Sequence, residues 1–475
     1  MDDGIKKTDS QEAVAGSGRM YKVGTLAYTK AALFEVLFWM LLGDFCLTMM
    51  EGVFPTVVPL QLRWAGAGDL VVGLVTLSIP ALLTLVFNPI MAMQSDRHRG
   101  PLGRRRPFLL WFTPIVVIAL VLLGTGKPIA HWLANVFVPE GGSAAADNLT
   151  VILIGLFSIL FSTGNIYILS SYQYLFKDVI PTEVLGRFVG LYRTIGALAS
   201  FVFNRYVVGQ TEAHTAQVYI STAILYAVAF FLLVWKVKEG DYPPPEEKKG
   251  GLRATYISYL KGAFGHPFYL KVYAQGFFFW GAWAPFMTFI IFFATEAKQP
   301  GYAASLGLSL DEFGKIKGWT VLCQAPVFLL AGWLTDRFHP LRVLIAGGVM
   351  TATTYFASFF LVHSATSFLI LWTLNTVSCG MFLAAYLAML TRLLPAARYG
   401  QFFSANQIVF QGGLMGFAAL VGWLINTVKD YRCIYLWSGT MSVLGIIMGV
   451  ALYRHWKRLG GDEGYVPPEC NNQEK

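Results

Sequence analysis

The chain is poor in charge and in cysteine, and it lacks the short motifs that mark common active sites. Only 13% of its 475 residues are Asp, Glu, Lys or Arg, about half the share of soluble domains. Its five cysteines have no spacing that suits a disulfide framework or a metal site. No phosphate-binding loop, metal-ligand cluster or nucleophile with a positioned base is present. The sequence therefore predicts no enzyme, no cofactor and no metal.

Hydrophobic residues make up 55% of the chain, in runs long enough to cross a bilayer, which takes about 20 apolar residues per helix. We expect an all-α membrane protein of about twelve helices. The apolar windows lie at 32–55, 69–94, 107–125, 149–175, 186–208, 217–236, 267–294, 312–335, 341–362, 366–391, 400–427 and 432–455.

The distribution of Lys and Arg predicts the orientation of these spans. The first twenty residues are polar and lack the short apolar core of a cleaved signal. With this tail inside, most of the Lys and Arg lie in the tails and inner loops, as the inside bias of positive charge requires. We therefore expect both termini in the cytoplasm, and we interpret the net charge of +9 as a topology signal without a nucleic-acid partner. The expected location is the plasma membrane, and the expected state is a monomer.

A proline-rich, charged linker, "KVKEGDYPPPEEKKGGLRA" from Lys236 to Ala254, divides the spans into six and six. The expected organisation is a cytoplasmic tail (1–30), a six-helix bundle (31–236), a cytoplasmic linker (237–265), a second six-helix bundle (266–456) and a cytoplasmic tail (457–475).

The two halves resemble each other in corresponding loops. The second span is followed by "SDRHRGPLGRRRPF" (Ser95–Phe108), and the eighth is followed by "GWLTDRFHPLRVLI" (Gly332–Ile345). Each half therefore has an Asp-Arg pair at the start of the equivalent inner loop. "VIPTEVLGRFVG" (Val179–Gly190) and "LLPAARYGQFFS" (Leu393–Ser404) share a Pro followed five residues later by Gly. Two matches in equivalent places predict duplicated halves, which are common in secondary transporters.

With twelve spans in two halves and this arginine-rich loop, the chain resembles the major facilitator superfamily. The longer form "SDR…GRRRPF" is similar to the glycoside and sucrose cation symporters, which include plant sucrose carriers and their animal and bacterial relatives. This resemblance implies sugar transport, of the sucrose:proton symport kind, by alternating access. The plant carriers have an arginine in the fourth span, and the stretch from Ser162 to Pro181 has none.

The repeated loops are the candidate gating elements. Arginines at the inner surface pair with anionic headgroups and fix the loop there. A carboxylate beside helix ends can also accept backbone N–H bonds and pair with arginine, forming a latch that breaks when the halves rock. The alternative is a role in topology alone. The residues concerned are Asp96, Arg97, Gly103, Arg104, Arg105, Asp336 and Arg337.

Ionisable groups inside spans are costly and are functional candidates by default. Glu35, Asp44 and Glu51 lie in the first span, and Arg193 and Arg205 lie in the fifth. Matching depths suggest the pairs Glu35–Arg193 and Glu51–Arg205. They leave Asp44 near the midplane without a basic partner, so we expect it to carry the coupling proton. Glu51, seven residues on, could share or replace that role. The alternatives are a structural hydrogen bond or a sodium site.

In the superfamily the first, fourth, seventh and tenth helices line the cavity, as the resemblance implies. Trp faces can stack on a sugar ring while amides bond its hydroxyls. For any one aromatic residue, packing within the bundle is the competing interpretation. The candidate substrate-binding residues on these helices are Asn165, Tyr172, Gln173, Gln275, Trp280, Trp283 and Asn375.

The sequence thus predicts a secondary active transporter that moves a sugar or glycoside with a cation, most simply a proton, through the lipid bilayer. Two alternatives stay open. The first is a transporter or exporter of another small amphipathic solute, and the second is a non-transporting membrane sensor with the same fold.

Overall fold

The computed structural model describes residues 20–138, 142–241, 263–296, 303, 305–395 and 398–468. It is helical almost throughout, because apolar chain in a bilayer must satisfy its backbone polar groups internally. The long helices are α1 (Lys30–Trp64), α3 (Ile79–Arg97), α4 (Arg106–Phe137), α5 (Gly142–Val179), α6 (Thr182–Val202), α7 (Thr215–Lys236), α9 (Pro267–Thr295), α10 (Leu310–Phe338), α11 (Pro340–Leu361), α12 (Ala365–Leu393), α13 (Tyr399–Val428) and α14 (Cys433–Arg458).

Short elements complete the chain. A helix, α2 (Asp69–Gly73), and a π-helical turn, η1 (Leu74–Ser78), run directly into α3 and extend it. Another π-helical turn, η3 (Phe203–Val207), and a 3-10 turn, η4 (Val208–Gln210), extend α6. A four-residue helix, α15 (Gly461–Gly464), follows α14.

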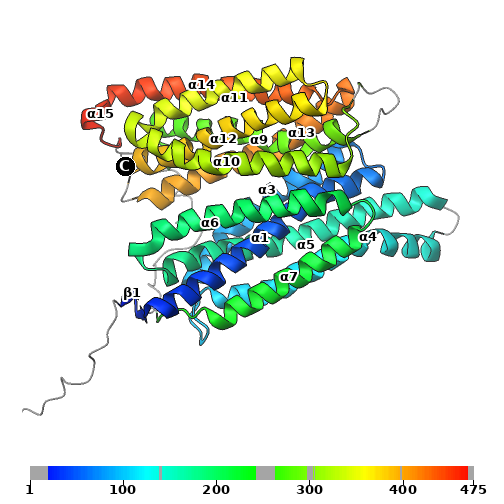
Figure 1. The fold of residues 1–475 in the computed structure, drawn as a ribbon, viewed down its shortest axis with the longest axis horizontal. Helices are drawn as coiled ribbons and strands as arrows, with labels where there is room; N and C mark the ends of the chain where they lie inside the picture. Colours follow the sequence, from blue (N-terminus) through cyan, green and yellow to red (C-terminus); the bar gives the residue numbers. More distant parts are fainter. Residues whose placement is uncertain are drawn as a thin grey trace, which may run out of the picture.

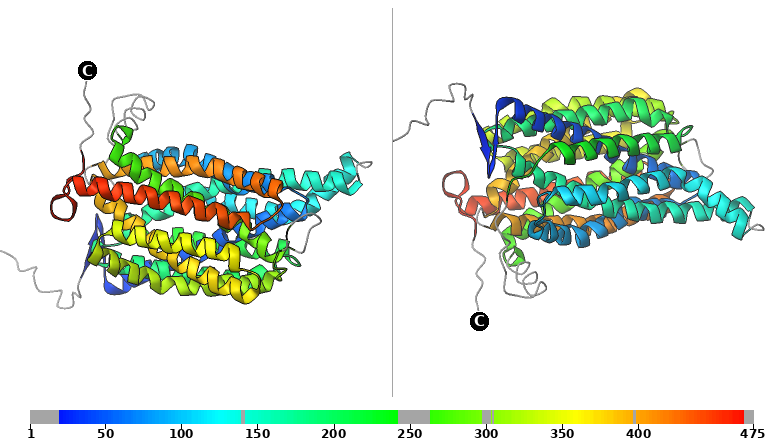
Figure 2. Two further views of the ribbon diagram at one scale, coloured as in Figure 1. Left: turned by 90° about the horizontal axis from the view of Figure 1, so that it is seen from above. Right: turned by 90° about the horizontal axis from the view of Figure 1, so that it is seen from below.

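The helices form two side-by-side bundles, α1 to α7 and α9 to α14 (Figure 1). Within the bundles α4 packs on α5 and α7, and α14 packs on α9 and α11. Between them α10 packs on α6 and η3, and α13 packs on α2, η1 and α3. Both ends of the described chain lie at one end of the molecule, the terminal end, and the opposite end is the distal end (Figure 2).

The predicted fold class is confirmed. In the described part of the chain, eleven helices are long and apolar enough to cross a membrane. The twelfth long helix, α6, is not among these eleven, and its sequence includes Glu183, Arg187 and Arg193. The helices are arranged as two groups of six (Figure 1).

Several helices are longer than their apolar windows. The window at 32–55 becomes a 35-residue α1 that continues through Pro55 and Pro59 to Trp64. Neighbouring helices can stabilise a proline-containing transmembrane helix. Likewise α4 and α5 project beyond the other helices at the distal end (Figure 2). Hydropathy marks only the part of a helix in hydrocarbon, so it cannot locate these ends.

A β-hairpin, β1 (Tyr21–Val23) and β2 (Leu26–Tyr28), precedes α1 within the segment predicted only as a polar tail. Gly24 has a φ of 54° and makes the turn. The Asp241 backbone N–H donates to Thr25 Oγ1 at 2.8 Å, so the hairpin lies against the chain that follows α7.

Candidate functional site

A buried carboxyl, Asp44 on α1, lies within the first half. It is 2% exposed, and it faces α6, since a Cβ added to Gly196 would lie 3.4 Å from Asp44 Oδ2. The Tyr192 hydroxyl is a hydrogen-bonding neighbour, and the charges of Glu51 and Arg193 also act on Asp44. Its Oδ2 atom has no hydrogen-bond partner in the described part of the chain. The predicted burial of Asp44 is therefore found, but Arg193 is a basic neighbour that was not expected.

Glu51 extends this polar region toward the distal end. The Asn165 side chain of α5 is its hydrogen-bonding neighbour, and the charge of Glu51 acts on Tyr226 of α7. The Tyr226 hydroxyl is buried and has no partner among the described residues. Glu51 lies seven residues beyond Asp44, about 10 Å along the helix. The two acids with Asn165, Tyr192 and Tyr226 are here termed the acid cluster.

The two predicted charge pairs are wrong. Glu35 is 56% exposed and pairs with Lys236 of α7 at 3.4 Å. Arg205 lies 3.9 Å from Asp311 of the second half. Arg193 is exposed, and its guanidinium lies 5.7 Å from the Tyr192 ring centre. Arg193 lies at the level of Asp44 and not of Glu35, since Gly196 of the same helix lies next to Asp44. Counting residues along each helix therefore gave neither the relative level of these two charges nor the direction of their side chains.

Three candidate substrate residues are buried within their own halves. The Tyr172 hydroxyl donates to the Met40 carbonyl oxygen. Asn375 Nδ2 donates to Thr354 Oγ1 at 3.0 Å. Gln275 is fully buried against a small cavity between helices of the second half, and its amide atoms have no hydrogen-bond partner among the described residues. Tyr172 and Asn375 therefore bond helices of one bundle to each other, and Gln275 packs inside one bundle.

The other four candidates are more accessible. Trp280 and Trp283 are partly buried, with ring centres 5.4 Å apart, and Trp280 stacks on Phe410 at 5.3 Å. Asn165 is partly buried beside Glu51, and Gln173 is exposed. The aromatic pair and the acid cluster therefore lie in different halves.

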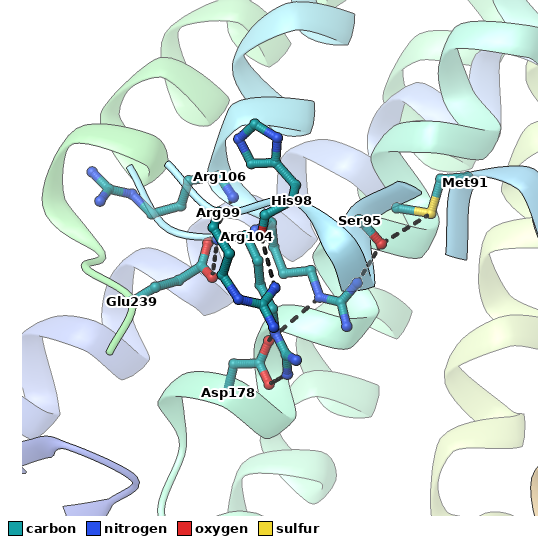
Figure 3. A network of polar contacts seen from close by, with 9 residues as sticks. Met91, Ser95, His98, Arg99, Arg104, Arg106, Asp178 and Glu239 are labelled. Carbon is teal, nitrogen blue, oxygen red and sulfur yellow. Dashed lines mark hydrogen bonds and ion pairs between the residues drawn. The ribbon is translucent and has the colours of Figure 1, made fainter. Parts of the chain in front are cut away.

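The arginine-rich loop between α3 and α4 is held by two carboxylates (Figure 3). Arg104 donates to both oxygens of Asp178, at 3.0 and 2.5 Å, and Arg105 Nε donates to Asp178 at 3.4 Å. Glu239 accepts from the backbone N–H groups of Arg104, Arg105 and Arg106 at 2.9, 2.9 and 2.7 Å. This carboxylate satisfies the free donors at the start of α4.

The chemistry predicted for Asp96 is thus supplied by Asp178 at the end of α5 and Glu239 after α7. The side chains of Asp96 and Arg97 lie outside the described residues. Gly103 has a φ of 92°, where a side chain would be strained. Asp178 and Glu239 were missed, although each is an acid at the inner end of a predicted span.

The second copy of the loop is simpler. Asp336 accepts from Arg392 Nη2 at 2.9 Å and joins the ends of α10 and α12. The Arg337 guanidinium lies 5.3 Å from the Trp333 ring centre. Like the contacts of Arg104 and Arg105, this ion pair lies within one half.

A third polar group joins the halves at the distal end. Arg63 Nε donates to Glu296 Oε1 at 2.6 Å, and Nη2 donates to the Tyr431 hydroxyl. Tyr431 in turn donates to Asp69 Oδ1 at 3.0 Å, which lies 3.7 Å from Arg63 Nη1. Arg63 and Glu296 are only 13% and 14% exposed, and Asp69 is fully buried. These four residues are here termed the distal clamp.

Further contacts between the halves surround the clamp. Asn426 Oδ1 accepts from the Asp69 backbone N–H at 3.3 Å, and Lys317 Nζ donates to Thr56 Oγ1 at 3.3 Å. At Gly422 a Cβ would clash with the Asp69 backbone, so only glycine permits this approach. The structure is therefore closed at the distal end.

We expect loss of the Arg63 charge to open the distal end. Breaking a buried charge network costs about 3–5 kcal/mol, which changes a two-state ratio roughly a hundredfold or more. With Cys323 and Cys470 replaced by serine, nitroxide labels on cysteines at Ala213 and Ala365 would report the distance between the distal loops of the two halves. Arg63→Gln should add a longer-distance population to the distribution.

The matched control is Lys236→Gln, because the Lys236–Glu35 pair, at 3.4 Å, joins α7 to α1 within the first half. It should leave the distance distribution unchanged. The same distribution in Arg63→Gln as in the parent would show that the clamp does not hold the halves together.

Comparisons with known proteins agree with this fold. The sequence model of the Major Facilitator Superfamily matches residues 286–464. The general alpha-glucoside permease of Schizosaccharomyces pombe is 22% identical over 222 residues, which are 44% of this chain and 39% of the permease. Proton-associated sugar transporter A of Homo sapiens is 26% identical over 220 residues, which are 44% of this chain and 28% of that protein. The chain thus matches well under half the length of either relative.

Solved structures match over nearly the whole chain. An inward-facing bacterial homologue of the human lysosomal transporter Spinster has a TM-score of 0.62 and 14% identity, covering 90% of this chain and 96% of that one. An inward-facing bacterial homologue of the iron transporter ferroportin has a TM-score of 0.63 and 16% identity, with coverages of 88% and 99%. The nucleoside transporter NupG has a TM-score of 0.59 and 13% identity, with coverages of 88% and 99%. These identities show a shared fold alone. The sequence match and the shared fold agree with the resemblance that was inferred from the arginine-rich loops: the chain is a multi-pass membrane protein with the fold of these solved transporters.

Proposed function

We propose that the chain is a secondary active transporter that carries a sugar or glycoside together with a proton. The observation that carries the proposal is the acid cluster. Asp44 is buried in a membrane-spanning helix, and neither Asp44 nor Glu51 forms an ion pair among the described residues. Buried carboxyls in a membrane mark proton and ion pathways.

The neighbours of the two acids support proton carriage. Tyr192, Asn165 and Tyr226 offer hydroxyl and amide groups that can bond a carboxyl in either protonation state. A sodium site would need several oxygen ligands around one point. A proton needs only one carboxyl, which Asp44 provides. Glu51 offers a second carboxyl farther along α1.

Sugar as the cargo is supported by the two sugar-transporting relatives and by Trp280 and Trp283 on α9. Their partly buried faces are suited to the apolar side of a sugar ring. Asn165 and Gln173 can bond hydroxyls from the first half. We assign Tyr172, Gln275 and Asn375 to the support of the bundles around the cargo.

The terminal end is proposed to face the cytoplasm, because the arginine-rich loop between α3 and α4 lies there together with both ends of the described chain (Figure 2), and positive charge is biased to the inside. The domain limits 1–30, 31–236, 237–265, 266–456 and 457–475 follow from the same reasoning. During alternating access the contacts of the distal clamp would break, and the distal end would open to the outside. The proposed location is the plasma membrane, and the proposed state is a monomer.

Substitution Asp44→Asn tests the proton-carrying role. In liposomes with an inward proton gradient, we expect concentrative uptake of labelled maltose, sucrose or glucose to fall to the level of passive equilibration. Exchange of cargo across the membrane should persist, because an amide keeps the volume and the hydrogen bonds but cannot take up a proton.

Glu35→Gln is the matched control, since Glu35 is an exposed carboxyl on the same helix. It should accumulate cargo as the parent does. Full accumulation by Asp44→Asn would exclude Asp44 as the coupling acid. Transport of no sugar by the parent would direct attention to another solute.

One observation favours a second cargo class, an anionic solute such as a sugar acid. Lys317 lies in a membrane-spanning helix with Nζ directed across the halves to Thr56, and it has no ion pair among the described residues. An unpaired ammonium group there is costly unless it faces a cavity or a partner. A carboxylate on the cargo would be such a partner.

Uptake of labelled glucuronate beside labelled glucose distinguishes the two classes. An anionic cargo predicts uptake of glucuronate by the parent and a loss of about tenfold or more in Lys317→Gln, since a hydrogen bond to a charged group contributes about 1.5–3 kcal/mol. Lys315→Gln should behave as the parent. Uptake of glucose alone, unaffected by Lys317→Gln, would reject the anionic class.

A further inference from the structure

A cavity of about 450 Å³ opens at the terminal end of the second half. It lies where α10 ends, α11 begins and α12 and α14 end, and α15 closes one side. We term it the arginine pocket. Its principal lining residues are Arg337, His339, Arg342, Arg392, Trp456 and Asp462.

Positively charged side chains outnumber negatively charged ones among the described residues of the pocket. Arg342 donates to Asp462 Oδ2 at 2.5 Å, and Arg392 pairs with Asp336 at 2.9 Å. Arg337 has no ion pair in the described part of the chain and instead lies over the rings of Trp333 and Phe338. Among the described residues, three arginines and two carboxylates therefore line the pocket, and the Arg337 guanidinium is the one of the three without an ion pair.

His339 makes the pocket a better site for an anion. Its ring stacks on Trp456 with centres 4.1 Å apart, and its Nδ1 accepts the Leu341 backbone N–H at 3.3 Å. Burial and the charge of Arg392 lower the pKa of His339 to about 4, so the ring is neutral at pH 7. With Nδ1 accepting, Nε2 carries the hydrogen and is a donor.

The surroundings of Arg337 point to the membrane surface. Trp333 and Phe338 are 54% and 45% exposed, at the end of a membrane-spanning helix. Exposed aromatic residues beside arginine are typical of the boundary between hydrocarbon and headgroups. An anion that binds here can thus have apolar chains on one side.

We propose that the arginine pocket binds a phosphate group, that of an anionic phospholipid headgroup. The planar guanidinium groups of Arg337 and its neighbours match phosphate oxygens in geometry and charge. The acyl chains would lie along Trp333 and Phe338. The bound lipid would hold α15 against the ends of α10 and α11.

Native mass spectrometry of the full-length protein tests this proposal. Titrations with phosphatidylglycerol and phosphatidylcholine should show tighter binding of phosphatidylglycerol. Arg337→Gln removes the cation that has no ion pair, so folding should persist, and affinity for phosphatidylglycerol should fall about tenfold, as expected for the loss of a charged hydrogen bond. Arg454→Gln is the matched control, because Arg454 is an exposed arginine of α14 outside the pocket.

A third titration with inorganic phosphate separates the two possible sources of the group. Failure of millimolar phosphate to displace phosphatidylglycerol would support the lipid. Displacement that depends on Arg337 would assign the site to a soluble phosphate and overturn the lipid. Equal affinities for the two lipids, or equal losses in Arg337→Gln and Arg454→Gln, would overturn the site itself.

Discussion

The contact between the two halves depends on the Arg63 guanidinium, which binds groups from three other segments at once. Glu296 and Tyr431 belong to the second half, and Asp69 belongs to the first. Each of these groups is buried or nearly so, and each would be destabilising without the others. The close contact of Gly422 with the Asp69 backbone is possible because glycine has no side chain.

At the terminal end the polar contacts have a different arrangement. Asp178 and Glu239 fasten the arginine-rich loop to the first half, and the Asp336–Arg392 pair joins two helices of the second half. Each half is thus stabilised internally at this end. Such a pair of rigid bundles is suited to rocking about their contact, which is the motion of alternating access.

The sequence was sufficient for the features that depend on local composition. Hydropathy predicted the spans, because a bilayer imposes length and apolarity on each helix. The proline-rich linker and the repeated loops predicted their division into two groups of six. Hydropathy missed the ends of α1, α4 and α5, which extend outside the apolar windows. The burial of Asp44 could also be predicted, since an acid amid apolar residues of a span has few other positions.

Features that depend on helix rotation or on distant loops could not be predicted. Glu35 points toward Lys236 of α7, and Arg193 lies beside Asp44, farther along α1. The distal clamp joins Arg63 to Tyr431 across 368 positions, and no local pattern marks either residue. Lys317 is different, because it lies inside an apolar window and a search of every span for basic residues would have found it.

For the proposed proton-coupled transport, the clamp and the acid cluster together impose an energetic requirement. A ligand shifts an equilibrium only by the difference between its affinities for the two states. If the clamp favours the distally closed state by about 3–5 kcal/mol, cargo and proton must bind the distally open state more tightly by a similar amount. Glu51 lies on α1 between Asp44 and Arg63, so a change in its charge acts on the helix that carries the clamp. This shared helix gives a physical route by which protonation could bias the distal contact.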